Sequence, residues 1–123
     1  MTETPVGIAN RYFELYNTQQ FDEIAKIVSD DIEVTHYNRG FHVQGRDQLL
    51  GLYEAANSML GDRGFSNRLA TTTDGKKVIL QHYFSGKNLV DTPFGPAGSD
   101  YGLDLCTILT IEDGLITKYE DYG

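Results

Sequence analysis

The sequence has few of the features that would place it outside the cell or in a membrane. It contains one cysteine, Cys106, so no intramolecular disulfide can form. No apolar run approaches the roughly 20 residues that a membrane-spanning helix needs. Residues 1–5 have neither the basic nor the apolar region of a signal peptide. We therefore expect a cytoplasmic protein that does not act on membranes.

Positive charge is also scarce. The chain has 10 Lys and Arg against 18 Asp and Glu, which gives a formal net charge of -8. Nucleic-acid binding needs a concentrated surface of Lys and Arg, so this balance argues against a nucleic-acid partner. A solvated acidic surface that aids solubility accounts for the charge.

The length and composition are those of one globular domain. A chain of 123 residues with 40% hydrophobic residues can bury one core. We find no repeat, low-complexity segment or linker. The sequence therefore predicts a single domain over residues 1–123.

The first half of the chain is predicted to be helical. Thr4 is suited to cap a helix that has Pro5 at its first position. The apolar residues that follow at helical spacing are Ile8, Tyr12, Leu15 and Tyr16. A second, short helix is lined by Phe21, Ile24, Ile27 and Val28. A third helix begins after Gly45, with Asp47 as its expected cap.

A first strand and a hairpin are predicted next. Residues 32–37 alternate in polarity and are rich in β-branched side chains, which is typical of a strand. Residues 65–73 and 76–86 flank Asp74-Gly75, a dipeptide favoured in two-residue hairpin turns.

The last third of the chain repeats this hairpin pattern. Residues 101–111 and 115–122 flank a turn that contains Asp113-Gly114, and residues 88–99 are expected to form a loop. Helices followed by hairpins indicate an α+β fold, with about three helices on one face of a curved antiparallel sheet.

Several segments of the chain match a known family pattern at nearly constant spacing. In the first half they are residues 11–15, 21–24, 30–34 and 43–49, and near the end they are residues 103–107 and 112–122. With these segments the chain resembles the nuclear transport factor 2-like superfamily. The first group is similar to ketosteroid isomerases and the second to SnoaL-like proteins. The resemblance implies a cone-shaped fold that encloses a pocket.

The resemblance also implies roles for four residues. The oxyanion-hole tyrosine of the isomerases falls on Tyr12, which is retained. Their general base, an aspartate, falls on His36, and their protonated aspartate falls on Cys106. In SnoaL-like cyclases an acid/base aspartate near the end of the last strand matches Asp121.

His36 is the leading candidate for a general base. Strand alternation places it on one face with Ile32 and Val34, so its imidazole is expected among apolar neighbours. Such surroundings favour the neutral form, which a general base requires. The alternative is a core histidine whose ring is satisfied by a backbone carbonyl.

Two carboxylates are candidates to work with His36. Without a bulge, Asp121 shares a strand face with Leu115, Thr117 and Tyr119, and the alternative is an exposed charge near the chain end. Asp104 shares a face with Cys106 and is expected in the pocket, and the alternative is a carboxylate that is paired at the pocket mouth or exposed. We predict that His36 pairs with Asp104 or Asp121 as an acid/base pair. Tyr12 would donate to the substrate oxygen.

Further residues are expected to line the pocket without taking part in the chemistry. These ligand-binding candidates are Tyr16, His82, Cys106 and Tyr119. Tyr16 and Cys106 also fit a packing role in the core. No His-x-His or His-x3-His spacing indicates a metal site, and no dinucleotide or phosphate-loop pattern occurs. Residues 61–64 are expected to form a turn, and we predict no cofactor.

Three classes of function stay open on the sequence. The first is a cyclase, isomerase or hydrolase that moves protons on a small, mostly apolar carbonyl compound. The others are a non-catalytic ligand-binding domain and a protein-interaction module. We also expect a homodimer through the sheet face opposite the helices, because that face needs cover. The apolar residues expected there are Leu103, Leu105, Leu109 and Ile111.

Overall fold

The structure is a computed structural model that describes residues 3–123. Residues 1–2, the start of the stretch without signal-peptide features, lie outside this range. The described helices are α1 (Pro5–Asn17), α2 (Phe21–Ile24), a 3-10 turn (Tyr37–Arg39) and α3 (Arg46–Asn57). The strands are β1 (Val28–His36), β2 (Phe41–Gln44), β3 (Leu60–Thr73), β4 (Lys77–Asn88), β5 (Asp100–Glu112) and β6 (Leu115–Tyr122).

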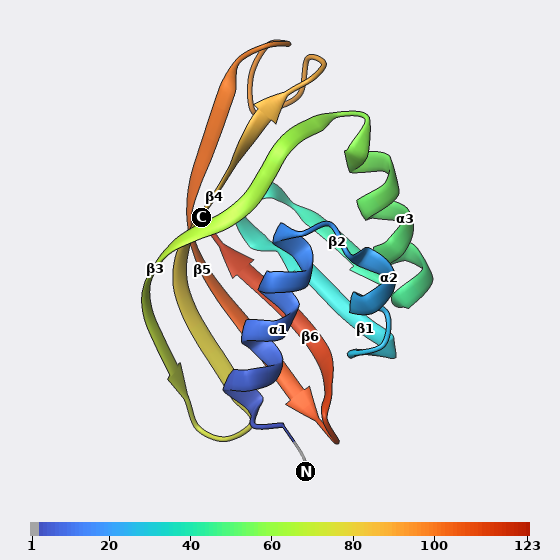
Figure 1. Cartoon of the computed structure of the whole chain (residues 1–123), viewed down its shortest axis with the longest axis vertical. Coiled ribbons are helices and arrows are strands. Elements are labelled where there is room, and N and C mark those ends of the chain that lie inside the picture. The colour runs from blue at the N-terminus through green and yellow to red at the C-terminus, as the bar shows by residue number, and fades with distance from the viewer. Residues whose placement is uncertain (1–2) are drawn as a thin grey trace.

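Six strands form one curved sheet in the order β2-β1-β6-β5-β4-β3. The helices lie against one face of it, as Figure 1 shows, which confirms the predicted α+β cone. The sheet is not purely antiparallel, because β1 and β6 pair in parallel. No hairpin joins these two strands, so no turn dictates their relative direction. Within residues 3–123 no helix is long and apolar enough to cross a membrane.

Helix α1 forms as its sequence predicts. The Thr4 hydroxyl accepts the Gly7 N–H at 3.0 Å and Pro5 is the first helical residue. The capping bond satisfies a backbone donor that the first turn leaves without a partner. The side chains of its buried face pack against the sheet. They are Ile8, Ala9, Tyr12, Phe13 and Tyr16.

Two predicted helix boundaries are wrong. Helix α2 ends at Ile24, and Val28 already belongs to β1, where it pairs with Ile116 of β6. Helix α3 is preceded by Gly45, with φ 93°, as its capping residue. Asp47 lies inside the first turn, where its charge interacts favourably with the helix dipole.

The two Asp-Gly turns differ in geometry. Asp113 and Gly114 both have positive φ, 52° and 77°, as a two-residue type I′ turn requires. In the other hairpin Thr73 pairs with Val78, so the chain reverses over a longer stretch than the predicted dipeptide. There the Asp74 carboxylate accepts the backbone N–H groups of the two lysines that follow it, at 2.9 and 2.8 Å.

The face assignment predicted for β5 is wrong. Asp104 is exposed and Cys106 half-buried, on the sheet face away from the helices. The residues that point inward are Leu105, Thr107, Leu109 and Ile111. The more apolar of the two faces packs against the helices, because its burial removes more apolar surface from water. The leucines and the isoleucine expected at a dimer interface are therefore on the core side.

A bulge interrupts the alternation of β6. Ile111 pairs with Ile116, whereas Thr110 pairs with Lys118, so Thr117 is an extra residue in the strand. The two ends of β6 consequently present residues of opposite parity to the core. Leu115 therefore does not share a face with Tyr119 and Asp121, as it would in a strand without a bulge.

Candidate active site

A histidine and a buried aspartate meet where β1 and β6 end. His36 pairs in register with Asp121, and its Nδ1 lies 2.6 Å from the aspartate Oδ1. The Asp121 side chain is 1% exposed and that of His36 17%. Asp121 is therefore not the solvated charge that its place near the chain end allowed. One carboxylate and one partly accessible imidazole form a pair with a fixed geometry.

Arg39 completes this cluster from the 3-10 turn. Its Nη2 lies 2.7 Å from His36 Nδ1 and 3.4 Å from Asp121 Oδ1, and its Nη1 donates to the Gly123 carbonyl at 3.3 Å. Nδ1 cannot both donate to the carboxylate and accept from the guanidinium. The conflict is resolved when the imidazole and the guanidinium both donate to Asp121 Oδ1, while Asp121 Oδ2 has no hydrogen-bond partner among the described residues. In a neutral His36 ring, this tautomer makes Nε2 the nitrogen without a proton.

The sequence did not indicate Arg39. It lies only three residues after His36, but its place beside the carboxylate depends on the 3-10 turn that follows β1. The one local signal was Gly40, whose φ of 62° ends that turn in a conformation that glycine adopts readily.

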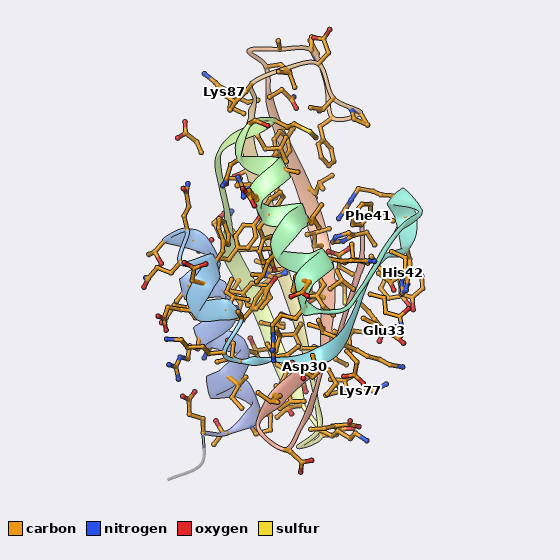
Figure 2. The ribbon with its side chains drawn as sticks, turned by 90° about the vertical axis from the view of Figure 1, so that its right-hand side faces the viewer. Asp30, Glu33, Phe41, His42, Lys77 and Lys87 are labelled. Carbon is orange, nitrogen blue, oxygen red and sulfur yellow. The ribbon has the colours of Figure 1, made fainter. Side chains whose placement is uncertain are left out.

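Aromatic rings surround the imidazole. The centroid of the His36 ring lies 5.4 Å from that of Phe41 and 5.9 Å from that of Tyr119. Figure 2 shows Phe41 on β2, the edge strand of the sheet. Burial raises the pKa of Tyr119 well above its ordinary value, and the nearby Asp121 carboxylate raises it further. The pair thus has an apolar lining with a neutral phenol beside it.

Tyr12 belongs to the same buried region. Its hydroxyl is hydrogen-bonded to that of Tyr53, and its ring lies 5.6 Å from that of Tyr119. Burial raises the pKa of Tyr12, so the phenol keeps its proton at neutral pH, as a hydrogen-bond donor must. Tyr12 is therefore linked to His36 through the ring of Tyr119. Tyr53, which the sequence did not indicate, is its direct partner.

Tyr16 is a core residue held by a buried cation. Arg63 Nε donates to its hydroxyl at 3.0 Å, and burial raises the pKa of Tyr16 while the Arg63 charge lowers it. Arg63 lies in the stretch 61–64 that was predicted to be a turn. This stretch is part of β3, bulged at Asp62, whose φ is 48°. At this bulge Arg63 points inward, which the alternation of side chains along a regular strand did not predict.

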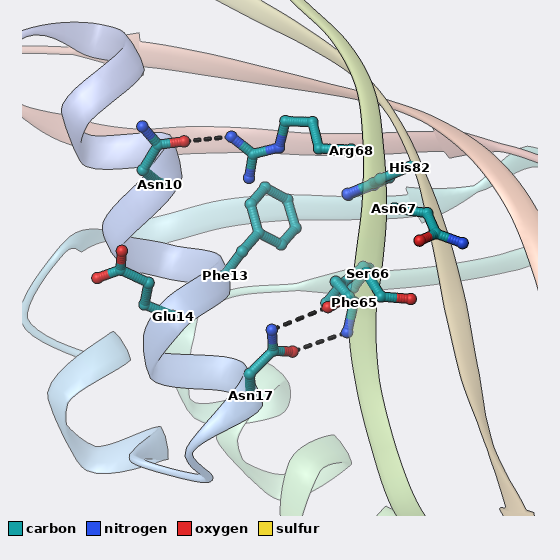
Figure 3. A pocket seen from close by; sticks show the side chains of 9 residues that line it. All are labelled: Asn10, Phe13, Glu14, Asn17, Phe65, Ser66, Asn67, Arg68 and His82. Atoms are coloured by element: carbon teal, nitrogen blue, oxygen red, sulfur yellow. Dashed lines mark hydrogen bonds between the residues drawn. The ribbon is translucent and has the colours of Figure 1, made fainter.

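His82 is buried but lies at a different place from His36. Its Nε2 is hydrogen-bonded to the Thr107 hydroxyl at 2.8 Å. Burial lowers the pKa of His82 to about 4, with a further contribution from the Arg68 charge, so the ring is neutral at pH 7. Figure 3 shows it in the lining of a pocket of about 280 Å³ between α1 and β3. His36 does not line that pocket.

Asp104 and Cys106 have no place in the cluster. Both lie on the outer face of β5, so their predicted positions inside the pocket are wrong. The residue of β5 that pairs with Asp121 is Thr107. Among the described residues, no group of three His, Cys, Asp or Glu side chains could hold a metal ion.

Solved structures with the same fold cover nearly all of the chain. A candidate polyketide cyclase from Xanthomonas campestris pv. campestris is 21% identical with a TM-score of 0.83, over 96% of this chain and 88% of that one. A protein with a ketosteroid isomerase-like fold from Catenulispora acidiphila, in complex with trimethylamine, is 16% identical with a TM-score of 0.80, over 98% and 87%.

An LEH-like epoxide hydrolase from M. tuberculosis is 16% identical with a TM-score of 0.74, over 94% of this chain and 78% of that one. No curated protein matches the chain. The profile of the SnoaL-like domain matches residues 9–119. The chain therefore belongs to the SnoaL-like domain family, in the nuclear transport factor 2-like fold.

Proposed function

We propose that the chain is a cofactor-free acid/base enzyme in which His36 is the general base and Asp121 its partner. The contact of 2.6 Å between His36 Nδ1 and Asp121 Oδ1 carries this proposal. A buried carboxylate on one ring nitrogen selects the tautomer and stabilises the imidazolium that forms when the other nitrogen takes a proton. Proton transfer with such a pair needs neither a metal nor a redox group.

The proposed substrate is a small, mostly apolar carbonyl compound. The rings of Phe41 and Tyr119 beside the imidazole favour an apolar ligand. Nε2 of His36 takes a proton from the carbon next to the carbonyl group, and the carbonyl oxygen becomes an enolate. The imidazolium then returns the proton to another atom of the substrate. Cyclisation and isomerisation both fit this sequence of steps, and the similar polyketide cyclase fold agrees with it.

The negative charge that develops on the substrate oxygen needs a hydrogen-bond donor that stabilises it. Tyr12 remains the proposed one, since burial keeps its phenol protonated. The Arg39 guanidinium contacts the other ring nitrogen, Nδ1, and adds a positive charge to the cluster.

Deuterium exchange tests the proposal without knowledge of the natural substrate. The protein is incubated in D2O with cyclohexanone, 2-tetralone or ethyl acetoacetate, and loss of the α-proton signal is followed by NMR. We expect exchange to be slower in His36→Gln by roughly 10²–10⁴, the usual contribution of an acid/base group. Asp121→Asn should slow it as well. His42→Gln, which changes an exposed histidine on β2, is the matched control and should keep the wild-type rate.

Equal rates in wild type and His36→Gln would contradict the proposed base. If none of the three compounds exchanges faster than in buffer, the result favours a non-catalytic ligand-binding domain.

We also propose a homodimer in the cytoplasm. The sheet face away from the helices exposes Ile79 of β4, which pairs with Ile108 of β5. These two side chains replace the β5 residues that were expected at the interface.

The lone Cys106 supports a reducing compartment, since it cannot form a disulfide within the chain.

A further inference from the structure

The 3-10 turn that follows β1 contacts the end of β6. Each of its three residues, Tyr37–Arg39, has a side chain hydrogen-bonded to a residue within 120–123, at 82 to 85 positions further along the chain. These contacts lie directly beyond the last residue pair that joins β1 and β6, which is His36 with Asp121. The turn therefore restrains the strand end that carries the proposed acid/base pair.

Tyr37 holds the residues on both sides of Asp121. Its hydroxyl donates to Glu120 Oε2 at 2.6 Å, and its ring stacks on that of Tyr122 at 4.7 Å with 15° between the planes. Glu120 and Tyr122 point away from the core, whereas Asp121 between them is buried. Tyr37 thus restrains the backbone of Asp121 without touching its carboxylate.

Asn38 and Arg39 bind the backbone of Gly123. The Gly123 N–H donates to Asn38 Oδ1 at 2.7 Å, and the Gly123 carbonyl accepts from Arg39 Nη1 at 3.3 Å. The other terminal nitrogen of Arg39 lies 3.4 Å from Asp121 Oδ1 and 2.7 Å from His36 Nδ1. The backbone of residue 123 therefore holds the guanidinium that completes the cluster.

Position 123 accepts only glycine in this arrangement. Its φ is 136°, and a Cβ atom there would clash with the backbone carbonyl oxygen of Asp104 in β5. A backbone atom cannot rotate away as a side chain can, so a larger residue would move the chain. The missing side chain lets Gly123 lie against β5 with its N–H and carbonyl groups within reach of the turn.

A pair at a strand end needs such a restraint. Residues at the end of an element open more readily than those in its middle, and the contact of 2.6 Å between His36 and Asp121 is at such an end. One exposed hydrogen bond contributes little by itself. Several that act on consecutive residues together lower the fraction of time that the strand end is open.

We propose that Tyr37, Asn38 and Gly123 are positioning residues for the His36–Asp121 pair. Their contacts, together with those of Arg39, form a clamp between residues 37–39 and 120–123. The clamp keeps Asp121 Oδ1 on His36 Nδ1 and so holds the ring in the tautomer whose Nε2 can accept a proton. Its consequence for catalysis rests on the proposed function, but the restraint itself does not depend on any reaction.

Amide hydrogen exchange measured by NMR tests the restraint. Asn38→Ala removes the acceptor of the Gly123 N–H. We expect the protected amides of residues 119–122 to exchange roughly three- to tenfold faster, the equivalent of one lost hydrogen bond. Tyr37→Ala/Asn38→Ala, which also removes the ring stacking, should have a larger effect. Gly123→Ala should act in the same direction, because it displaces the backbone.

Two comparisons separate the clamp from a general loss of stability. The amides of β3 and β4 should keep their wild-type exchange rates in the clamp variants, which global destabilisation would not allow. Gln48→Ala is the matched control, since the Gln48 side-chain amide also accepts one backbone N–H, that of Gln44 at 3.0 Å. It should leave residues 119–122 unchanged. Circular dichroism checks folding, and if Gly123→Ala does not fold, the two turn variants carry the test.

The ring nitrogens of His36 give a second readout. At a pH where the ring is neutral, nitrogen-15 NMR of the wild type should show a protonated Nδ1 and a bare Nε2, and His36→Gln identifies these signals. In the clamp variants the two signals should move towards each other, because a released imidazole samples both tautomers. Unchanged amide exchange and unchanged ring signals in Tyr37→Ala/Asn38→Ala would overturn the clamp.

Deuterium exchange of the ketone probes then separates the two proposals. If the clamp variants change the ring signals but the wild type exchanges no probe, the clamp is supported and the acid/base function is contradicted. If the wild type exchanges a probe and the clamp variants keep both the wild-type ring signals and the wild-type rate, the acid/base function stands and the clamp is wrong.

Discussion

At the residue scale, burial makes His82 a group that lowers the stability of the folded protein under acid conditions. Its pKa is lowered from 6.5 to about 4, first by burial and then by the Arg68 charge, while Asp121 acts in the opposite direction. Between these two values the unfolded chain binds a proton that the folded chain does not. The contribution of neutral His82 to the free energy of unfolding is therefore fully present above pH 6.5. It is lost as the pH falls towards 4.

We predict that the free energy of unfolding of the wild type falls more steeply between pH 7 and pH 4.5 than that of His82→Phe. Urea unfolding at several pH values measures the difference. Carboxylates also titrate in this range, so only the difference between the two proteins reports on His82. His42→Gln, at an exposed position, should keep the wild-type slope. Parallel curves for wild type and His82→Phe would show that His82 is not the cause.

At the scale of elements, Arg63 joins two helices to the sheet. It is 5% exposed, and beyond Tyr16 of α1 its guanidinium donates to three oxygens at the end of α3 and the start of β3. These are Tyr53 O, Asn57 Oδ1 and Leu60 O, at 3.2, 2.9 and 3.2 Å. The cation has no carboxylate partner among the described residues. Two aromatic rings lie within 6 Å of it instead, those of Tyr16 and Phe21, at 5.7 and 5.2 Å.

We predict that Arg63→Met destabilises the protein by roughly 2–4 kcal/mol. The substitution removes the cost of burying a charge, but it leaves several buried oxygens without a donor, and the second effect is larger. Arg63→Lys should recover only part of the loss, since one ammonium cannot reach all four oxygens. Lys26→Met, at an exposed ion pair, is the control and should change stability by less than about 1 kcal/mol. Wild-type stability of Arg63→Met in urea unfolding would refute this role.

At the scale of the whole molecule, the outer face of the sheet is the surface left for association. Within residues 3–123 the helices pack on the other face, as Figure 1 shows. Ile79 is 37% exposed on the uncovered face and lies opposite Ile108 in the neighbouring strand. Apolar side chains paired across two strands of an open face gain most when a second copy covers them.

We therefore predict sedimentation at twice the chain mass of 13.8 kDa at micromolar concentration. Ile79→Lys should shift the protein to the monomer, because a second copy would bury its charge. Val90→Lys, an exposed apolar position in the loop between β4 and β5, should leave the dimer intact. A wild-type monomer would contradict the proposed assembly.

Local signals in the sequence were enough for the elements that a few neighbouring residues control. Thr4 and Pro5 start α1, and the Asp113-Gly114 turn closes the last hairpin, because a capping bond or a positive φ depends on residues close in the chain. The order of these elements predicted the α+β cone. The pairing of His36 with a carboxylate was also expected, since alternation and the family resemblance both placed His36 inside.

Only the tertiary structure decided which carboxylate that was. Both faces of β5 carry apolar residues, so alternation alone could not tell which one packs against the helices. The bulge at Thr117 changes the parity of β6 and is set by pairing with β5. These long-range contacts bury Asp121 beside His36 and leave Asp104 on the outer face. The cluster thus depends on strand register. Register is set by pairing between segments far apart in the chain, so neither segment alone predicts it.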